Sequence, residues 1–261
     1  MNLAVEENGD GAPVVLAHGL TATRRYVLHG SRLLERSGCR VIGYDARGHG
    51  ESDPAPEPRA YEYSDLVGDL ERVLDERGVD RAVLVGVSMG AATTMAFALE
   101  RPERLRALVQ VTPAHFGLPP DPAAASRWDA LADGLERDGV EGFMRAYGDP
   151  PVEERFRGLI LQALRQRMER HRHPEAVAAA LRVVPRSVAF DGPDALDGLE
   201  VPTLVVASRD EADPQHPYAV AVEYQRRIPR AELVSEEPGA SPLAWRGAQL
   251  SRAILAFLER N

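Results

Sequence analysis

Short apolar runs alternate with helical patterns, and this alternation restricts the fold more than any other feature of the chain. The runs cover residues 13–18, 40–45, 81–87, 106–111 and 201–207, with a weaker run at 231–235. Each run is followed by glycine, aspartate, serine or proline, residues that begin loops and helices. Runs that are apolar throughout are typical of parallel strands buried on both faces. The pattern therefore predicts an α/β protein with a mostly parallel central sheet and helices on both faces.

Residues 113–200 interrupt this rhythm. No strong strand pattern occurs there, and helical spacing covers residues 126–137, 152–170 and 174–184, with prolines in the connecting segments. We predict a helical lid or cap at residues 113–200, inserted between two parts of an α/β core at residues 1–112 and 201–261. The cap would lie over the carboxyl ends of the strands, where open α/β sheets bind their ligands.

The pentapeptide G-V-S-M-G at residues 86–90 carries the clearest chemical signal. It follows the buried run at 81–87 and precedes a helix-forming segment, which is the context of a nucleophile elbow. Small residues at both ends let the backbone turn sharply, so that the Ser88 hydroxyl stands above the sheet at a helix N-terminus. A helix N-terminus favours developing negative charge. Ser88 is therefore the predicted nucleophile.

With this pentapeptide in its context, the chain resembles the α/β hydrolase fold family, and further segments agree. They are H-G-L at residues 18–20 after the first run, D-A-R-G-H-G-E-S at residues 45–52, P-T-L-V-V at residues 202–206, and Asp210 just beyond. The resemblance covers nearly the whole chain apart from the cap. It implies an α/β hydrolase fold and a site that needs no cofactor.

The resemblance also implies roles for individual residues. An oxyanion formed at Ser88 needs two backbone N–H donors, and the expected pair is Leu20 and Met89. His18 and Gly19 are expected to support the loop that carries Leu20. His49, within the D-x-R-G turn, is expected to be structural.

The segment at residues 236–245 departs from the family pattern. The family order is serine, acid, histidine, with the histidine on the loop after the last strand. That loop reads E-E-P-G-A-S-P-L-A-W here, and no histidine follows His216. Because a serine hydroxyl needs a base to accept its proton, another histidine would have to serve. The candidates are His216 and His115, and the third possibility is that no residue replaces the base.

The acidic partner is also open. Asp210 stands where the family's catalytic acid usually stands, Asp213 is the second candidate, and Glu237 lies near the vacant histidine position. A carboxylate at position 210 could alternatively cap the following segment.

These features favour a serine hydrolase acting on a small ester, thioester or lactone, with Ser88, Asp210 and His216 as the relay. A degenerate or non-hydrolytic relative that uses the oxyanion pocket for binding or proton chemistry is the alternative. A small-molecule receptor on the same scaffold is the third hypothesis, because a fold does not dictate a function.

Composition excludes several other classes. The net charge is -9 and the pI is about 5.4, whereas nucleic-acid binders usually carry a basic stripe. No apolar stretch reaches the length of a membrane span, and the N-terminus does not resemble a signal peptide.

Cys39 is the single cysteine, consistent with a reducing, cytoplasmic location. No metal motif occurs, and His171 and His173 are expected to face solvent. We expect a carbonyl-containing small molecule as the partner.

Overall fold

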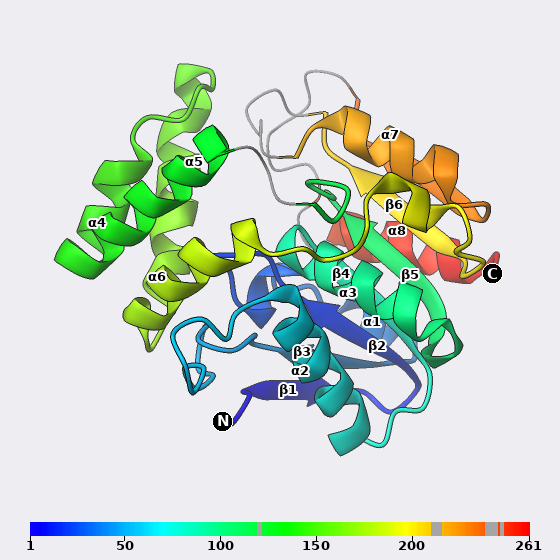
Figure 1. The fold of residues 1–261 in the computed structure, drawn as a ribbon. Helices are drawn as coiled ribbons and strands as arrows, with labels where there is room; N and C mark the ends of the chain where they lie inside the picture. Colours follow the sequence, from blue (N-terminus) through cyan, green and yellow to red (C-terminus); the bar gives the residue numbers. More distant parts are fainter. Residues whose placement is uncertain (119–121, 210–215, 238–244, 246–247) are drawn as a thin grey trace.

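The computed structural model describes residues 1–118, 122–209, 216–237, 245 and 248–261, and within them lies a seven-stranded sheet (Figure 1). Its strands are β1 (Val5–Asn8), β2 (Ala12–Ala17), β3 (Cys39–Tyr44), β4 (Ala82–Val87), β5 (Leu105–Val111), β6 (Thr203–Ala207) and β7 (Ala231–Ser235). They are ordered β1-β3-β2-β4-β5-β6-β7. Only β1 pairs antiparallel. The predicted mostly parallel α/β sheet is confirmed.

The sheet core divides into two layers because strand side chains alternate between faces. Val15, Leu84 and Val205 face the layer that includes α2 (Tyr63–Glu76), α3 (Met89–Glu100) and α7 (Tyr218–Arg227). The residues that alternate with them along the strands, such as Val14, Val83 and Leu204, face α1 (Leu33–Arg36) and α8 (Ala248–Leu258). Helices therefore cover both faces, as the continuous apolar runs predict. The remaining short 3-10 helices are η1 (Arg24–Tyr26), η2 (Pro102–Arg104), η3 (Val184–Arg186) and η4 (Pro193–Leu196).

The register of the central strands brings the chemical motifs to one edge. β2 pairs with β4 so that Ala17 lies opposite Gly86, and β4 pairs with β5 so that Val87 lies opposite Val111. Parallel strands end on the same side of a sheet. The loop after β2, the turn after β4 and the segment after β5 consequently leave the sheet side by side.

Three helices lie between β5 and β6, to one side of the sheet (Figure 1). They are α4 (Pro122–Tyr147), α5 (Glu154–Met168) and α6 (Pro174–Val183). We call them the cap. They bury a cluster of their own, which includes Leu135, Phe143, Leu164 and Leu181. The described part of residues 113–200 contains no strand, although the cap boundaries at 113 and 200 stay a prediction.

Two local features differ from the sequence reading. β1 was not predicted, because its V-E-E-N sequence has no apolar run and lies at the sheet edge. α4 extends beyond the predicted helix and breaks at Asp138 and Gly139, where Gly139 has a φ of +61°. Its two halves then approach closely, since a Cβ on Gly134 would lie 2.4 Å from the Gly142 carbonyl oxygen. Among the described residues, no helix is both long and apolar enough to cross a membrane.

Candidate active site

Ser88 occupies a sharp turn between β4 and α3. Its φ is +53° and its ψ is -110°, a backbone conformation that non-glycine residues rarely adopt and that occurs preferentially at functional sites. The Ser88 N–H donates to the Val111 carbonyl at 3.1 Å, which ties the turn to the neighbouring strand. The residue is half-buried. This geometry is the one expected of a nucleophile elbow.

The glycines on either side of Ser88 are required by close backbone contacts. A Cβ on Gly86 would lie 2.2 Å from the Gly90 carbonyl oxygen, and a Cβ on Gly90 would lie 2.2 Å from the Ala17 carbonyl oxygen. Backbone atoms cannot move aside as flexible side chains do. The two positions therefore accept only glycine while the strand and helix keep their spacing.

His216 lies beside the candidate nucleophile. Its Nε2 is 2.8 Å from the Ser88 Oγ, although 128 positions separate the two residues in sequence. His216 comes two residues before α7 and is half-buried. Of the predicted acids, Asp210 and Asp213 lie outside the described residues, and Glu237 is exposed.

The loop at residues 18–22, which we call the oxyanion loop, passes next to Ser88. A Cβ on Gly19 would lie 3.4 Å from the Ser88 Cβ. Among the described residues, the Leu20 amide has no backbone acceptor, and the Met89 amide is the first of α3, where an N–H has no intrahelical acceptor. Leu20 directly follows Gly19 and Met89 directly follows Ser88, so both predicted oxyanion donors have amides that the described backbone contacts leave available.

His18 supports this loop from below. The Ala46 N–H donates to its Nε2 at 2.9 Å, so the neutral ring carries its proton on Nδ1, which donates to the Gly19 carbonyl at 2.8 Å. Burial and the neighbouring His49 lower the pKa of His18 to about 3. A neutral imidazole that makes a hydrogen bond at each ring nitrogen is suited to holding the loop in place.

His115, the other predicted alternative base, lies near His216 but is engaged elsewhere. Its Nδ1 accepts from the Gly117 N–H at 3.0 Å, and its Nε2–H points to the Tyr63 hydroxyl at 3.3 Å. Burial, followed by the proximity of His216, lowers the pKa of His115 to about 4. Of the two histidines, the described contacts bring His216 to Ser88 and His115 to Tyr63.

His171 contradicts the expectation that it faces solvent. Its side chain is buried, and burial together with His49 lowers its pKa to about 3. The ring lies 5.5 Å from that of His49, which in turn lies 5.2 Å from that of His18. The basic neighbours of His171 in the sequence suggested an exposed segment. Periodicity alone does not show which residue after a helix has its side chain buried.

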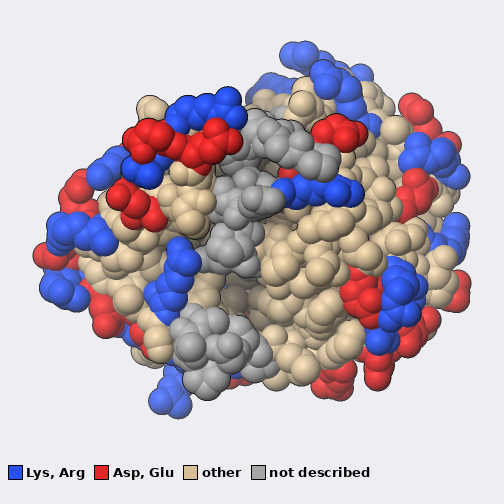
Figure 2. Space-filling model, turned by 90° about the horizontal axis from the view of Figure 1, so that it is seen from above, with Lys and Arg blue, Asp and Glu red and all other residues tan. Residues whose placement is uncertain are grey.

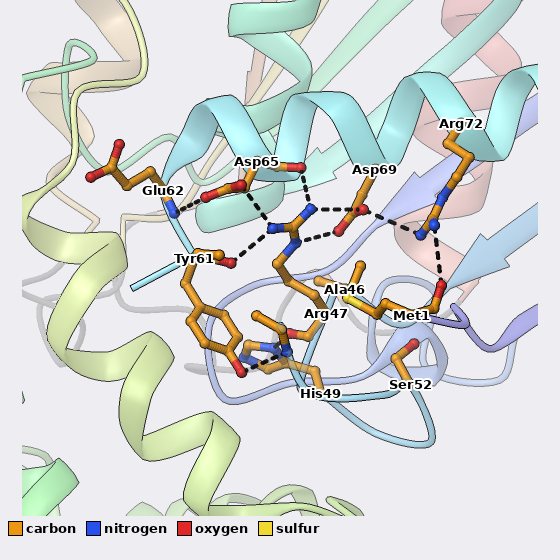
Figure 3. A network of polar contacts seen from close by, with 12 residues as sticks. Met1, Ala46, Arg47, His49, Ser52, Tyr61, Glu62, Asp65, Asp69 and Arg72 are labelled. Atoms are coloured by element: carbon orange, nitrogen blue, oxygen red, sulfur yellow. Dashed lines mark hydrogen bonds and ion pairs between the residues drawn. The ribbon is translucent and has the colours of Figure 1, made fainter. Parts of the chain in front are cut away.

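The D-x-R-G turn is fastened to α2 by Arg47 (Figure 3). Its guanidinium makes a bidentate pair with Asp69, at 2.6 and 2.9 Å, and also contacts Asp65 and the Ala60 carbonyl. A buried guanidinium with this many acceptors is well compensated for lost hydration. The ion pair holds the turn whose Ala46 amide supports His18.

A network that sequence reasoning missed lies at the start of α7, where Tyr218 is two residues after His216. Arg209 donates to Tyr218 Oη at 2.6 Å and to Ser235 Oγ at 2.9 Å, and its guanidinium stacks 4.1 Å from the Tyr218 ring. Glu236 accepts from the Arg209 N–H at 2.6 Å and from Trp245 Nε1 at 3.1 Å. The network joins the ends of β6 and β7 to the start of α7. Its only sequence signal was the unusual composition of residues 236–245.

The face above the site is unevenly charged. Figure 2 shows charged side chains over the cap at the left and along the right margin, with a largely uncharged area directly to the right of the residues that are not described. Among the described residues, no group of three or more His, Cys, Asp or Glu side chains could hold a metal ion.

Comparison with known proteins places this geometry in context. Epoxide hydrolase 2 of Siraitia grosvenorii is 37% identical over 116 residues, which cover 44% of this chain and 36% of the relative. Across the three epoxide hydrolases of that plant, the matched region spans 36% to 40% of their length.

Two solved structures match almost end to end. An esterase of Thermogutta terrifontis has a TM-score of 0.79 at 29% identity, covering 99% of this chain and 93% of its own. The enol-lactonase of Burkholderia xenovorans LB400 has a TM-score of 0.79 at 22% identity, covering 98% of this chain and 96% of its own, and shows likeness of fold. The sequence profile of the α/β hydrolase fold matches residues 12–190. Sequence, fold and profile agree, and the chain belongs to the α/β hydrolase fold family.

Proposed function

We propose that this protein is a serine hydrolase that cleaves a small ester, thioester or lactone through an acyl-Ser88 intermediate. The single observation that carries the proposal is the 2.8 Å contact between His216 Nε2 and Ser88 Oγ. A hydroxyl at hydrogen-bond distance from an imidazole can lose its proton as it attacks a carbonyl carbon. Ser88 is the nucleophile and His216 the general base.

The reaction proceeds in two steps. As Ser88 Oγ bonds to the carbonyl carbon, its proton passes to His216 and the carbonyl oxygen becomes an oxyanion between the Leu20 and Met89 amides. Collapse expels the alcohol, thiol or ring oxygen, which takes the proton from His216. Water then attacks the acyl-serine by the reverse proton path and releases the acid. Asp210 is the proposed partner that orients His216.

A carbonyl substrate suits the surroundings of Ser88. The two amide donors act on oxygen that gains negative charge, which is the event of acyl transfer. The similarity to an esterase over nearly the full chain supports the same chemistry. The cap, which contributes side chains beside the oxyanion loop, would select the shape of the acyl or alcohol group.

The test uses p-nitrophenyl acetate and a fluorophosphonate probe on the wild type, Ser88→Ala and His216→Ala. We expect the wild type to turn over the ester and to be labelled once at Ser88. Each variant should lose about 10⁴-fold in kcat, because members of a catalytic relay fail together. Ser64→Ala, an exposed serine on α2, is the matched control and should remain fully active.

Other outcomes would point elsewhere. Labelling at Ser88 without steady turnover would favour the degenerate or non-hydrolytic alternative, which uses the oxyanion pocket for binding or proton chemistry. Absence of both labelling and turnover would contradict the hydrolase proposal and favour a small-molecule receptor. Full activity of His216→Ala would assign the proton transfer to another group.

A further inference from the structure

The cap is tied to the oxyanion loop through His171, which lies in the segment that joins α5 to α6. The Gly50 N–H donates to His171 Nδ1 at 2.9 Å, so the neutral ring carries its proton on Nε2. That Nε2–H donates to the Thr21 carbonyl at 3.1 Å. The next residue repeats the connection, because the Arg172 N–H donates to the Gly50 carbonyl at 2.8 Å. One residue of the segment between α5 and α6 thus joins the loop after β2 to the turn after β3.

The Thr21 carbonyl is the start of a chain of hydrogen-bonded peptide groups. It belongs to the same peptide as the Ala22 N–H, which donates to the Gly19 carbonyl at 3.0 Å. The Gly19 carbonyl in turn belongs to the same peptide as the Leu20 N–H. In a trans peptide the C=O and N–H point in opposite directions, so bonds to the Gly19 oxygen determine where the Leu20 N–H points.

Hydrogen bonds in such a series polarise one another. The donor at one end, His171 Nε2–H, therefore strengthens the donor at the other end, Leu20 N–H. Thr21 has a φ of +70°, a conformation that a threonine adopts only when its surroundings hold it. The bond from His171 is one of the contacts that hold it.

Apolar packing supports the same link. The Leu20 side chain packs against the cap cluster that includes Leu131 and Val177. The Met89 side chain is buried with Ala176 and Ala180 of α6. The side chains of Leu20 and Met89, the two proposed oxyanion donors, thus both contact the cap.

We propose that His171 is a positioning residue of the oxyanion hole, which aims and polarises the Leu20 N–H through the Thr21–Ala22 and Gly19–Leu20 peptides. The cap is then part of the catalytic apparatus as well as a cover, since its docking and the geometry of the oxyanion donor depend on the same imidazole. This inference rests on the proposed serine-hydrolase function.

Two substitutions each keep one of the two hydrogen bonds that the His171 ring makes. In His171→Gln the amide nitrogen reaches the place of Nε2 and keeps a donor for Thr21. In His171→Asn the amide oxygen reaches the place of Nδ1 and keeps an acceptor for Gly50 while the donor to Thr21 is lost. His173→Asn, a partly exposed neighbour in the same segment, is the control.

The measurements are kcat and KM for p-nitrophenyl acetate, inhibition by a trifluoromethyl ketone, and the amide resonance of Leu20 in a ¹⁵N-labelled sample. The ketone forms a tetrahedral oxyanion on Ser88 and so reports on the oxyanion hole. We expect His171→Asn to lose about tenfold in kcat, less than the loss of a whole oxyanion donor. Its KM should change less than twofold, and ketone affinity should fall with kcat. His171→Gln should stay within threefold of the wild type in kcat.

The resonance gives an answer that does not depend on turnover. We expect the Leu20 amide signal to move in His171→Asn and to stay near its wild-type position in His171→Gln and His173→Asn. Equal losses in both His171 variants, or an unmoved Leu20 signal in His171→Asn, would overturn the positioning role and leave His171 as a cap anchor. A wild type that neither turns over the ester nor reacts at Ser88 would instead overturn the proposed function, while the Leu20 signal still decides the role of His171.

Discussion

The two sides of the candidate active site are held in place by different kinds of contact. On the nucleophile side, Ser88 and the oxyanion loop are held by backbone contacts and by buried, neutral histidines. Gly86 and Gly90 have no room for a side chain, and the His18 ring is fully enclosed. On the base side, His216 precedes α7 and is half-buried, and the nearby network of Arg209, Tyr218, Glu236 and Trp245 consists of partly buried polar side chains.

The difference shows which parts of such a site can be rearranged. Backbone contacts allow almost no substitution, because a single Cβ would collide with another main chain. A side-chain network can be rebuilt with different residues as long as one imidazole reaches the serine. This chain has no histidine on the loop after β7, and a histidine before α7 lies at Ser88 instead.

The largest effect is expected on the nucleophile side, from Gly90→Ala. Its Cβ would lie 2.2 Å from the Ala17 carbonyl oxygen, and we expect the free energy of unfolding to fall by about 3 kcal/mol. Urea denaturation measures the change. Gly68→Ala in α2, where nothing lies within 4 Å, is the control and should gain about 0.5–1 kcal/mol. Equal stability of Gly90→Ala and the wild type would show that backbone contacts do not hold the nucleophile side of the site in place.

The buried histidines predict a loss of stability in acid. The pKa values of His18 and His171 are lowered to about 3, whereas histidine in an unfolded chain titrates near pH 6.5. The unfolded state therefore binds more protons below pH 6.5, and stability falls as the pH drops from there toward 3. At pH 5 each of the two histidines should account for about 2 kcal/mol of the loss.

Denaturation at pH 7 and pH 5 tests this effect. His171→Gln removes one of the buried rings whose pKa is lowered, so its stability should depend less steeply on pH than that of the wild type. Identical pH dependence in the wild type and in His171→Gln would mean that His171 is not held neutral by burial.

The smallest effect is expected on the base side, from Arg209→Gln. The variant loses the contacts to Tyr218 and Ser235, so His216 should be less well oriented, and kcat/KM should fall about fivefold. The free energy of unfolding should change by less than about 1 kcal/mol, since the network is partly exposed. Arg226→Gln, at an exposed arginine of α7, is the control. A collapse of activity comparable to that of Ser88→Ala would show that this side is as rigid as the other.

Much of the fold and of the nucleophile side could be predicted because the signals are local. The apolar runs give the strands, and the pentapeptide around Ser88 contains the proposed nucleophile, both glycines and one proposed oxyanion donor within five residues. The H-G-L segment similarly combines Leu20 with the histidine that braces it. β1 gave no such signal, because an edge strand with one solvated face needs no apolar run.

The base side could not be predicted in the same way. The sequence favoured His216 by its place after Asp210, but His115 and the absence of any replacement stayed open, because local sequence does not show which ring reaches a serine on a different strand. The burial of His171 was also beyond the sequence, since its partners Thr21 and Gly50 lie more than a hundred positions away.

By itself, the sequence determined the family of the fold, the position of the elbow and the residues of the oxyanion loop, because steric limits on neighbouring residues act along the chain. Only the tertiary structure decided which imidazole meets Ser88 and how the cap reaches the oxyanion loop. Those contacts form between segments that are distant in sequence, and their distances depend on how whole elements pack against the sheet.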